Sequence, residues 1–104
     1  MSAGASRRSE AARREAAEAI AIKALGFLAG DDERLERFLA LSGLAAGDLR
    51  AAAAAPGFLP GVLDHVLSDD RLILAFAAEL GLDPAEIGRA RAALERGAPP
   101  LGSI

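Results

Sequence analysis

The 104-residue chain contains no cysteine, threonine, asparagine, glutamine, tryptophan or tyrosine, and only one histidine, one lysine and one methionine. Without cysteine there is no disulfide, no thiol nucleophile and no thiolate metal site. The strand-forming residues are scarce, with two valines in the chain, which argues against a β-sheet. Asparagine and glutamine, which read adenine through two hydrogen bonds, are missing. What remains is dominated by 26 alanines, 16 leucines, 11 glycines and 11 arginines, a composition that favours helices.

The charges are mixed and nearly balanced. The net charge is −3, from 12 basic and 15 acidic residues, and both signs are interspersed along the chain. No basic stretch offers the footprint that nucleic acid or an anionic membrane requires. No apolar run approaches the roughly 18 residues of a membrane span, and residues 1–19 lack the apolar centre of a signal peptide. We therefore expect a cytoplasmic bacterial protein without a membrane segment.

The hydrophobic pattern predicts an all-α fold, a compact six-helix bundle in a single domain over residues 9–97. A disordered segment, residues 1–8, is expected before this domain, and a flexible tail, residues 98–104, after it. The clearest helix start is Asp83-Pro84-Ala85-Glu86, with an N-cap, proline at the first helical position and glutamate two residues later. The expected helices begin near Ser9, after a cap at Asp31 or Asp32, near Asp48, near Gly57, after a cap at Ser68 or Asp69, and at Pro84. The third contains the alanine run 51–55 up to Pro56.

A shift of 38 residues aligns the two halves of the chain without a gap. A capping position, an aromatic core position and a C-cap glycine each recur at this offset. The pattern predicts two pseudo-repeated three-helix units packed against each other. The alternative is that two helical hairpins in a biased alphabet look alike by chance. The matching pairs are Asp31 and Asp69, Asp32 and Asp70, Phe38 and Phe76, Gly43 and Gly81, and Leu44 and Leu82.

Ala77, Gly81 and Ile87 have the spacing of a helix-turn-helix motif, with the helix after residue 83 in the recognition position. Any tight helix pair joined by a glycine turn requires the same residues. The first turn of that recognition helix is acidic, and only Arg89 and Arg91 offer donors for phosphate or guanine. A structural helical hairpin is therefore the preferred interpretation, and DNA binding through residues 73–92 is the alternative.

The pattern of polar residues indicates no catalytic or metal site. His65 is the single imidazole, and the 38-residue shift places it over Phe27, so we interpret it as a half-buried residue in an aromatic position. The acidic clusters 31–33 and 69–70 precede helix starts and lack the alternating spacing of a calcium loop, so we interpret them as caps. We expect no enzymatic activity, no cofactor and no metal.

The helix expected over residues 69–80 is apolar around much of its circumference. Leu72 and Leu74 lie off the stripe of Ile73, Phe76 and Leu80. Such a helix is either deeply buried or part of an interface. We therefore expect a non-enzymatic protein–protein interaction or regulatory module, with Leu72 and Leu74 as contact residues. The expected partner is protein, either a second copy of the chain or a different one.

Five segments carry a family resemblance: AIKALGFLAG (21–30), RFLALSGL (37–44), DLR (48–50), FLPGVLDHVLSDD (58–70) and LAFAAELGLDP (74–84). In this order and spacing they resemble the domain of unknown function 3572 family, a group of short all-helical proteins from alphaproteobacteria. The resemblance covers roughly residues 18–96, and His65 stands where an aromatic residue is more usual in the family. It implies an all-helical fold but no activity, because the family has no assigned function and no functional residues transfer.

Overall fold

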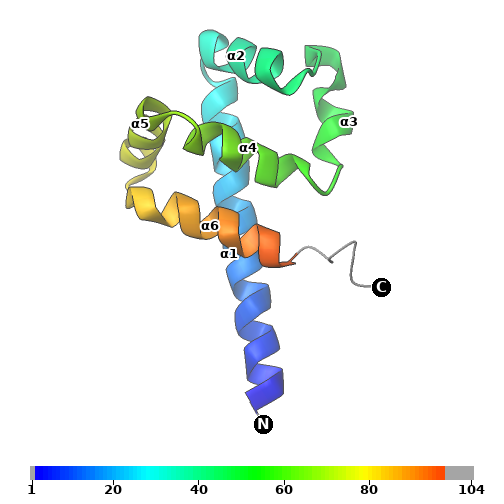
Figure 1. Ribbon diagram of the computed structural model, residues 1–104, viewed down its shortest axis with the longest axis vertical. Helices are drawn as coiled ribbons and strands as arrows, with labels where there is room; N and C mark the ends of the chain where they lie inside the picture. Colours follow the sequence, from blue (N-terminus) through cyan, green and yellow to red (C-terminus); the bar gives the residue numbers. More distant parts are fainter. Residues whose placement is uncertain (1, 98–104) are drawn as a thin grey trace.

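The computed structural model describes the backbone of residues 2–97 and the side chains of residues 9–95. In this part of the chain the regular structure is entirely helical, with six α-helices and one short 3₁₀-helix, which confirms the predicted all-α fold (Figure 1). The predicted tail, residues 98–104, lies outside the described residues. The elements are α1 (Ser2–Ala29), α2 (Asp32–Ser42), η1 (Ala46–Asp48), α3 (Leu49–Ala53), α4 (Phe58–Leu67), α5 (Asp70–Leu80) and α6 (Pro84–Gly97).

The longest helix, α1, begins earlier than the sequence predicted. It starts at Ser2 rather than near Ser9. Alanine has the highest helix propensity, and extending an existing helix costs far less than starting a new one. Residues 9–16 are exposed, and this end of α1 projects from the rest of the molecule (Figure 1).

The helices α2 and α5 have equal lengths and matching ends. Asp31 and Asp69 are extended N-cap residues, and each carboxylate accepts a hydrogen bond of 2.9 Å from the N–H two residues further on. Gly43 and Gly81 end these helices with φ values of 75° and 68°, in the left-handed region that favours glycine. Of the candidate caps, the structure has Asp31 rather than Asp32 and Asp69 rather than Ser68, and it confirms both glycine stops.

The start of α6 is also as predicted. Asp83 accepts a hydrogen bond of 2.9 Å from the N–H of Ala85, and its own N–H donates to the carboxylate of Glu86 at 2.8 Å. Pro84 occupies the first helical position, where its missing N–H costs nothing. This reciprocal pair fixes the point at which the chain turns from α5 into α6.

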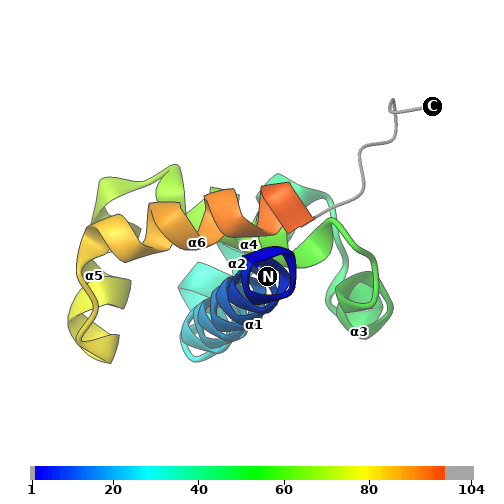
Figure 2. The same ribbon diagram turned by 90° about the horizontal axis from the view of Figure 1, so that it is seen from below.

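The core lies where α1, α4 and α6 meet. Both α4 and α6 cross the same side of α1, and they contact each other there (Figures 1 and 2). The α1 residues at this crossing include Ala21 and Ala24, which have no exposed surface and allow the helix axes to approach closely. No helix of the described chain is both long and apolar enough to cross a membrane. The largest fully buried side chains are Leu28, Val62, Leu63, Val66, Phe76 and Ile87.

The 38-residue offset holds for α2, α5 and their end turns, but the structure does not show two equivalent three-helix units. The flanking helices differ in length: α1 has 28 residues against 10 in α4, and α3 has 5 against 14 in α6. The sequence predicted that the alanine run would be helical up to Pro56, but α3 ends at Ala53. A proline disfavours helical backbone in the residue before it, which shortens α3. The larger repeat stays a prediction.

Candidate functional site

The two leucines expected to contact a partner lie on different faces of α5. Leu74 is 62% exposed. Leu72 is half-buried and packs against the core. The buried residues of α5 are Phe76 and Ala77, which pack into the core and hold the helix in place. Leu74 is therefore open to a partner as the fold stands, whereas Leu72 also supports the fold.

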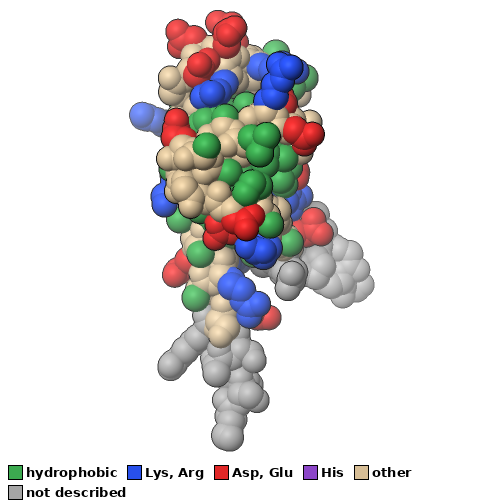
Figure 3. Space-filling view, turned by 90° about the vertical axis from the view of Figure 1, so that its left-hand side faces the viewer, with side chains coloured by type: hydrophobic (Ala, Val, Ile, Leu, Met, Phe, Trp, Pro, Cys, Tyr) green, Lys and Arg blue, Asp and Glu red, His purple; other side chains and the backbone are tan. Residues whose placement is uncertain are grey.

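Leu74 belongs to a second apolar stripe on α5, which we call the outer face of α5 and define as Arg71, Leu74, Ala75, Ala78 and Glu79. The first four positions follow the i, i+3, i+4, i+7 spacing that places residues on one side of a helix. All five residues are exposed except Ala75, which is half-buried. Figure 3 looks toward the side of the molecule where α5 lies, and hydrophobic side chains gather in the middle of it with charged groups around them.

The helix-turn-helix spacing is used to pack α5 against α6. Ala77 is 3% exposed and Ile87 is not exposed at all. Gly81 supplies the left-handed turn between the two helices. These three positions therefore satisfy a structural requirement, whether or not the pair also binds DNA.

The two arginines of the DNA-binding alternative have different surroundings. Arg91 lies 2.7 Å from the carboxylate of Asp64 on α4 and 3.4 Å from that of Glu95. The hydrogen bond from Arg91 to Asp64 raises the pKa of the guanidinium. Arg89 is exposed. Arg91 thus ties α6 to α4 and already has two carboxylate partners.

His65 lies on α4 in an aromatic environment, in agreement with the sequence interpretation. Its ring is half-buried and stands edge-on to Phe38 of α2, with ring centroids 5.1 Å apart. The buried Nε2 atom has no hydrogen-bond partner among the described residues. Burial and then the positive charge of Arg37 lower the pKa of His65, and Asp69 opposes them. The imidazole is therefore neutral at neutral pH.

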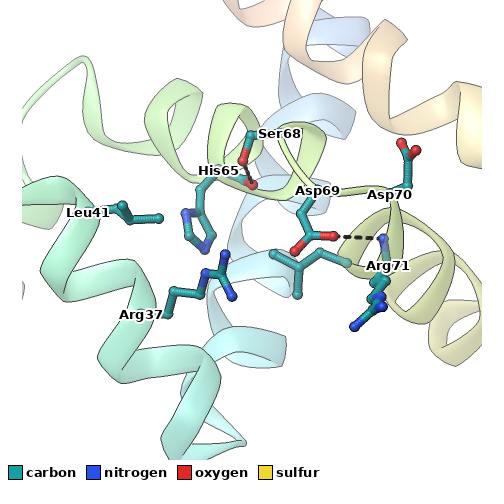
Figure 4. Close-up of a pocket in the computed structure, with 8 residues that line it drawn as sticks. Arg37, Leu41, His65, Ser68, Asp69, Asp70 and Arg71 are labelled. Carbon is teal, nitrogen blue, oxygen red and sulfur yellow. Dashed lines mark hydrogen bonds between the residues drawn. The ribbon is translucent and has the colours of Figure 1, made fainter.

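The His65 ring borders an open groove of about 400 Å³ between α2 and the turn from α4 to α5, which we call the His65 groove. In Figure 4 one edge of the ring faces the guanidinium of Arg37, whereas Asp70 and the end of Arg71 point away from the ring. The lining residues are Arg37 and Leu41 of α2, His65 of α4, Ser68 and Asp69 of the turn, and Asp70, Arg71 and Leu72 of α5.

Local backbone groups occupy the polar atoms of the turn. The Ser68 hydroxyl donates to the carbonyl oxygen of His65 at 2.7 Å, and the Asp69 carboxylate caps α5. Arg37 has no carboxylate within salt-bridge distance among the side chains described here. The side chains of Asp70 and Arg71 likewise have no hydrogen-bond or salt-bridge partner among the described residues, but they point away from the ring, so Arg37 and His65 are the two unpaired groups that face each other in the groove (Figure 4). Across residues 9–95, no group of three or more histidine, aspartate or glutamate side chains is placed to hold a metal ion.

Sequence reasoning did not find the His65 groove. Its residues come from two segments about 30 positions apart in the chain, and neither segment has a motif of its own. The one available signal was the 38-residue shift, which placed a polar ring at an apolar position. That signal pointed to His65 but gave no indication of Arg37 or Leu41.

Comparison with known families identifies the chain. A family model described as Protein of unknown function (DUF3572) matches residues 14–97. The chain belongs to the DUF3572 family. The match spans every helix from α2 to α6 and the part of α1 that reaches the core, so it confirms the resemblance seen in the sequence. No match was found among curated proteins or among solved structures. DUF3572 carries no assigned activity, and a function must therefore be argued from the surface of the molecule.

Proposed function

We propose that this DUF3572 protein is a non-enzymatic protein–protein interaction module that binds through the outer face of α5. The observation that carries the proposal is the exposure of Leu74, at 62%, on a helix whose opposite side is already committed to the core. Ala75 and Ala78 flank it with small side chains, which let a partner helix approach closely. Its action in the cytoplasm remains a prediction from the sequence.

The partner we propose is a second copy of the chain, packed with its α5 antiparallel to the first. Two-fold dimers are the commonest soluble oligomers, and their interface must be complementary to itself. The outer face of α5 meets this condition, because Arg71 lies near the start and Glu79 near the end of the stripe. An antiparallel pair centred on Ala75 places Arg71 of each copy opposite Glu79 of the other.

Sedimentation equilibrium over a wide concentration series tests the proposal. We expect the wild-type chain to form dimers reversibly and Leu74→Glu to remain a monomer, since the substitution puts two carboxylates at the centre of the interface. Ile22→Glu is the matched control, because Ile22 of α1 is 58% exposed and lies outside the stripe. A wild-type chain that is monomeric throughout, or a Leu74→Glu variant that still forms dimers, contradicts the proposal.

The alternative function is DNA binding through α5 and α6. It is favoured by the tight packing of the two helices around Ala77, Gly81 and Ile87. It is opposed by the acidic first turn of α6 and by the pairing of Arg91 with Asp64. We therefore rank it second.

A further inference from the structure

We propose that the His65 groove binds an organic anion, namely a carboxylate joined to a short aliphatic group. This site shares Arg71 with the outer face of α5, but none of the groups that carry the inference belongs to that face, so it does not depend on the function proposed above. Its volume, about 400 Å³, falls within the range of small-molecule pockets. Its lining combines two leucines with Arg37 and His65, two unpaired polar groups that face each other, which is the pattern of a site that orients an amphipathic ligand.

His65 has a ring nitrogen whose hydrogen-bonding capacity is not satisfied within the described residues. The Nε2 atom is buried and bonds to no described residue, and a buried ring nitrogen without a partner destabilises the fold. Ring nitrogens in such positions generally have a partner, so the missing hydrogen bond calls for an explanation. A carboxylate oxygen accepting from Nε2–H supplies that hydrogen bond.

Arg37 offers a positive charge without a carboxylate partner among the described side chains. Its side chain is exposed, its guanidinium faces the edge of the His65 ring, and no described carboxylate lies within salt-bridge distance (Figure 4). A guanidinium presents several donors and matches the two oxygens of a carboxylate. We infer that a bound carboxylate accepts from Arg37 with one oxygen and from His65 with the other, and draws the arginine side chain away from the ring edge that it faces.

The groove also has an apolar part, formed by Leu41 and Leu72. Leu41 is 68% exposed, the highest value among the large hydrophobic residues described, and it lies on the rim. Leu72 contributes a second aliphatic side chain. A short aliphatic chain bound between them removes apolar surface from water on both sides. This distinguishes the proposed ligand from inorganic anions, which have no apolar part.

The charges around the ring predict how binding depends on pH. Arg37 contributes a positive charge beside the ring and Asp69 a negative one, whose carboxylate also caps α5; Asp70 and the end of Arg71 point away. With a neutral imidazole these charges cancel, whereas a protonated imidazole leaves one net positive charge. An anion therefore binds the protonated form more tightly, and by linkage it raises the pKa of His65.

The experiment follows the imidazole proton signals of His65 by NMR, which are unambiguous because the chain has one histidine. The probes are hexanoate, as a free fatty acid, and N-acetyl-leucine, as a peptide C-terminus; acetate and hexanol each lack one half of the ligand. We expect hexanoate or N-acetyl-leucine to shift these signals with an affinity on the order of 1 mM and to move their titration to higher pH. The one that binds more tightly identifies the source of the ligand.

Arg37→Gln should weaken binding about tenfold or more, because it removes a charge-assisted hydrogen bond. Arg50→Gln on α3 is the matched control, since Arg50 is exposed and does not line the groove, and it should leave binding unchanged. The inference is overturned if neither carboxylate moves the His65 signals or their titration. It is equally overturned if acetate or hexanol acts as strongly as the full probes, or if both arginine variants bind like the wild type.

Discussion

His65 packs against Phe38, as Phe27 packs against Phe76. The 38-residue offset between the two halves of the chain converts one of these contacts into the other. The His65 and Phe38 ring centroids lie 5.1 Å apart, and those of Phe27 and Phe76 lie 5.3 Å apart. Residue 65 is residue 27 plus 38, and residue 38 is residue 76 minus 38, so the two contacts correspond to each other. Each contact joins one half of the chain to the other, and neither half retains its aromatic contact alone.

Removing one of these rings should therefore cost much of the stability of the molecule. Phe76 has no exposed surface, so Phe76→Ala leaves a cavity. We expect a loss of about 3–5 kcal/mol in the free energy of unfolding, measured by urea denaturation. Leu41→Ala is the control and should change the value by less than about 0.5 kcal/mol, because Leu41 is 68% exposed. A loss for Phe76→Ala as small as that of the control would contradict the packing described here.

The pH dependence of stability should report on His65. Its pKa lies below the ordinary value of 6.5 in the folded chain, so the unfolded chain takes up a proton at higher pH than the folded chain does. The fold thus favours the neutral imidazole of His65. The stability that this preference contributes is fully present above pH 6.5 and is lost as the pH falls through the lowered pKa. Urea unfolding between about pH 7.5 and about pH 5 should show this loss.

The control for this prediction is His65→Phe, which keeps an aromatic ring against Phe38 and removes the titrating nitrogen. We expect this variant to lose the part of the pH dependence due to the imidazole. It should also be more stable at neutral pH by about 1 kcal/mol, because no buried nitrogen is left unpaired. If the variant and the wild type have parallel pH profiles, the environment assigned to His65 is wrong.

Two glycine-to-alanine substitutions should have effects of opposite sign. An added Cβ meets no heavy atom within 4 Å at either Gly26 or Gly81, so backbone conformation alone decides the outcome. Gly26 lies within α1, where alanine should stabilise the fold by about 0.5–1 kcal/mol. Gly81 has a φ of 68°, and alanine there should destabilise it by about 1–2 kcal/mol. Thermal or urea unfolding of both variants measures the two changes in the free energy of unfolding. If both changes had the same sign, the turn geometry at Gly81 would not be as described.

The DNA-binding alternative is tested by a gel shift with random duplex at low salt, where even non-specific binding is detected. We expect no shift. Arg91→Ala should instead reduce the free energy of unfolding by up to about 1 kcal/mol, because it removes the ion pair with the partly exposed Asp64. A shift that is lost in a double Arg89→Ala, Arg91→Ala variant would favour the alternative over the proposed interaction module.

Local features were predictable because each depends on a few neighbouring residues. Aspartate caps at residues 31, 69 and 83 satisfy the first N–H groups of a helix, and glycines 43 and 81 accept the left-handed turn that ends one. The proline at 84 and the glutamate at 86 fixed the start of α6 in the same way. The boundaries of α1 and α3 were less predictable, because cooperative extension and the effect of Pro56 act over several residues.

The candidate site residues were only partly predictable from the sequence. The sequence singled out Leu74 as a leucine outside the core stripe of its helix, but it gave Leu72 the same role. Only the tertiary structure separates them, because α4 and the rest of the core cover one side of α5 and leave the other open. It also gave Arg91 a partner on another helix, which the spacing of residues in α6 does not encode.

The helical fold and the places where most helices begin and end could be read from the sequence alone. These properties follow from composition, helical periodicity and capping residues, all of which act over short distances along the chain. The tertiary structure decided how the helices cross, which leucine stays exposed, and that Arg37, Leu41 and His65 border one groove. Those relationships join α2 with α4 and α5, and they depend on which helix faces fill the core together.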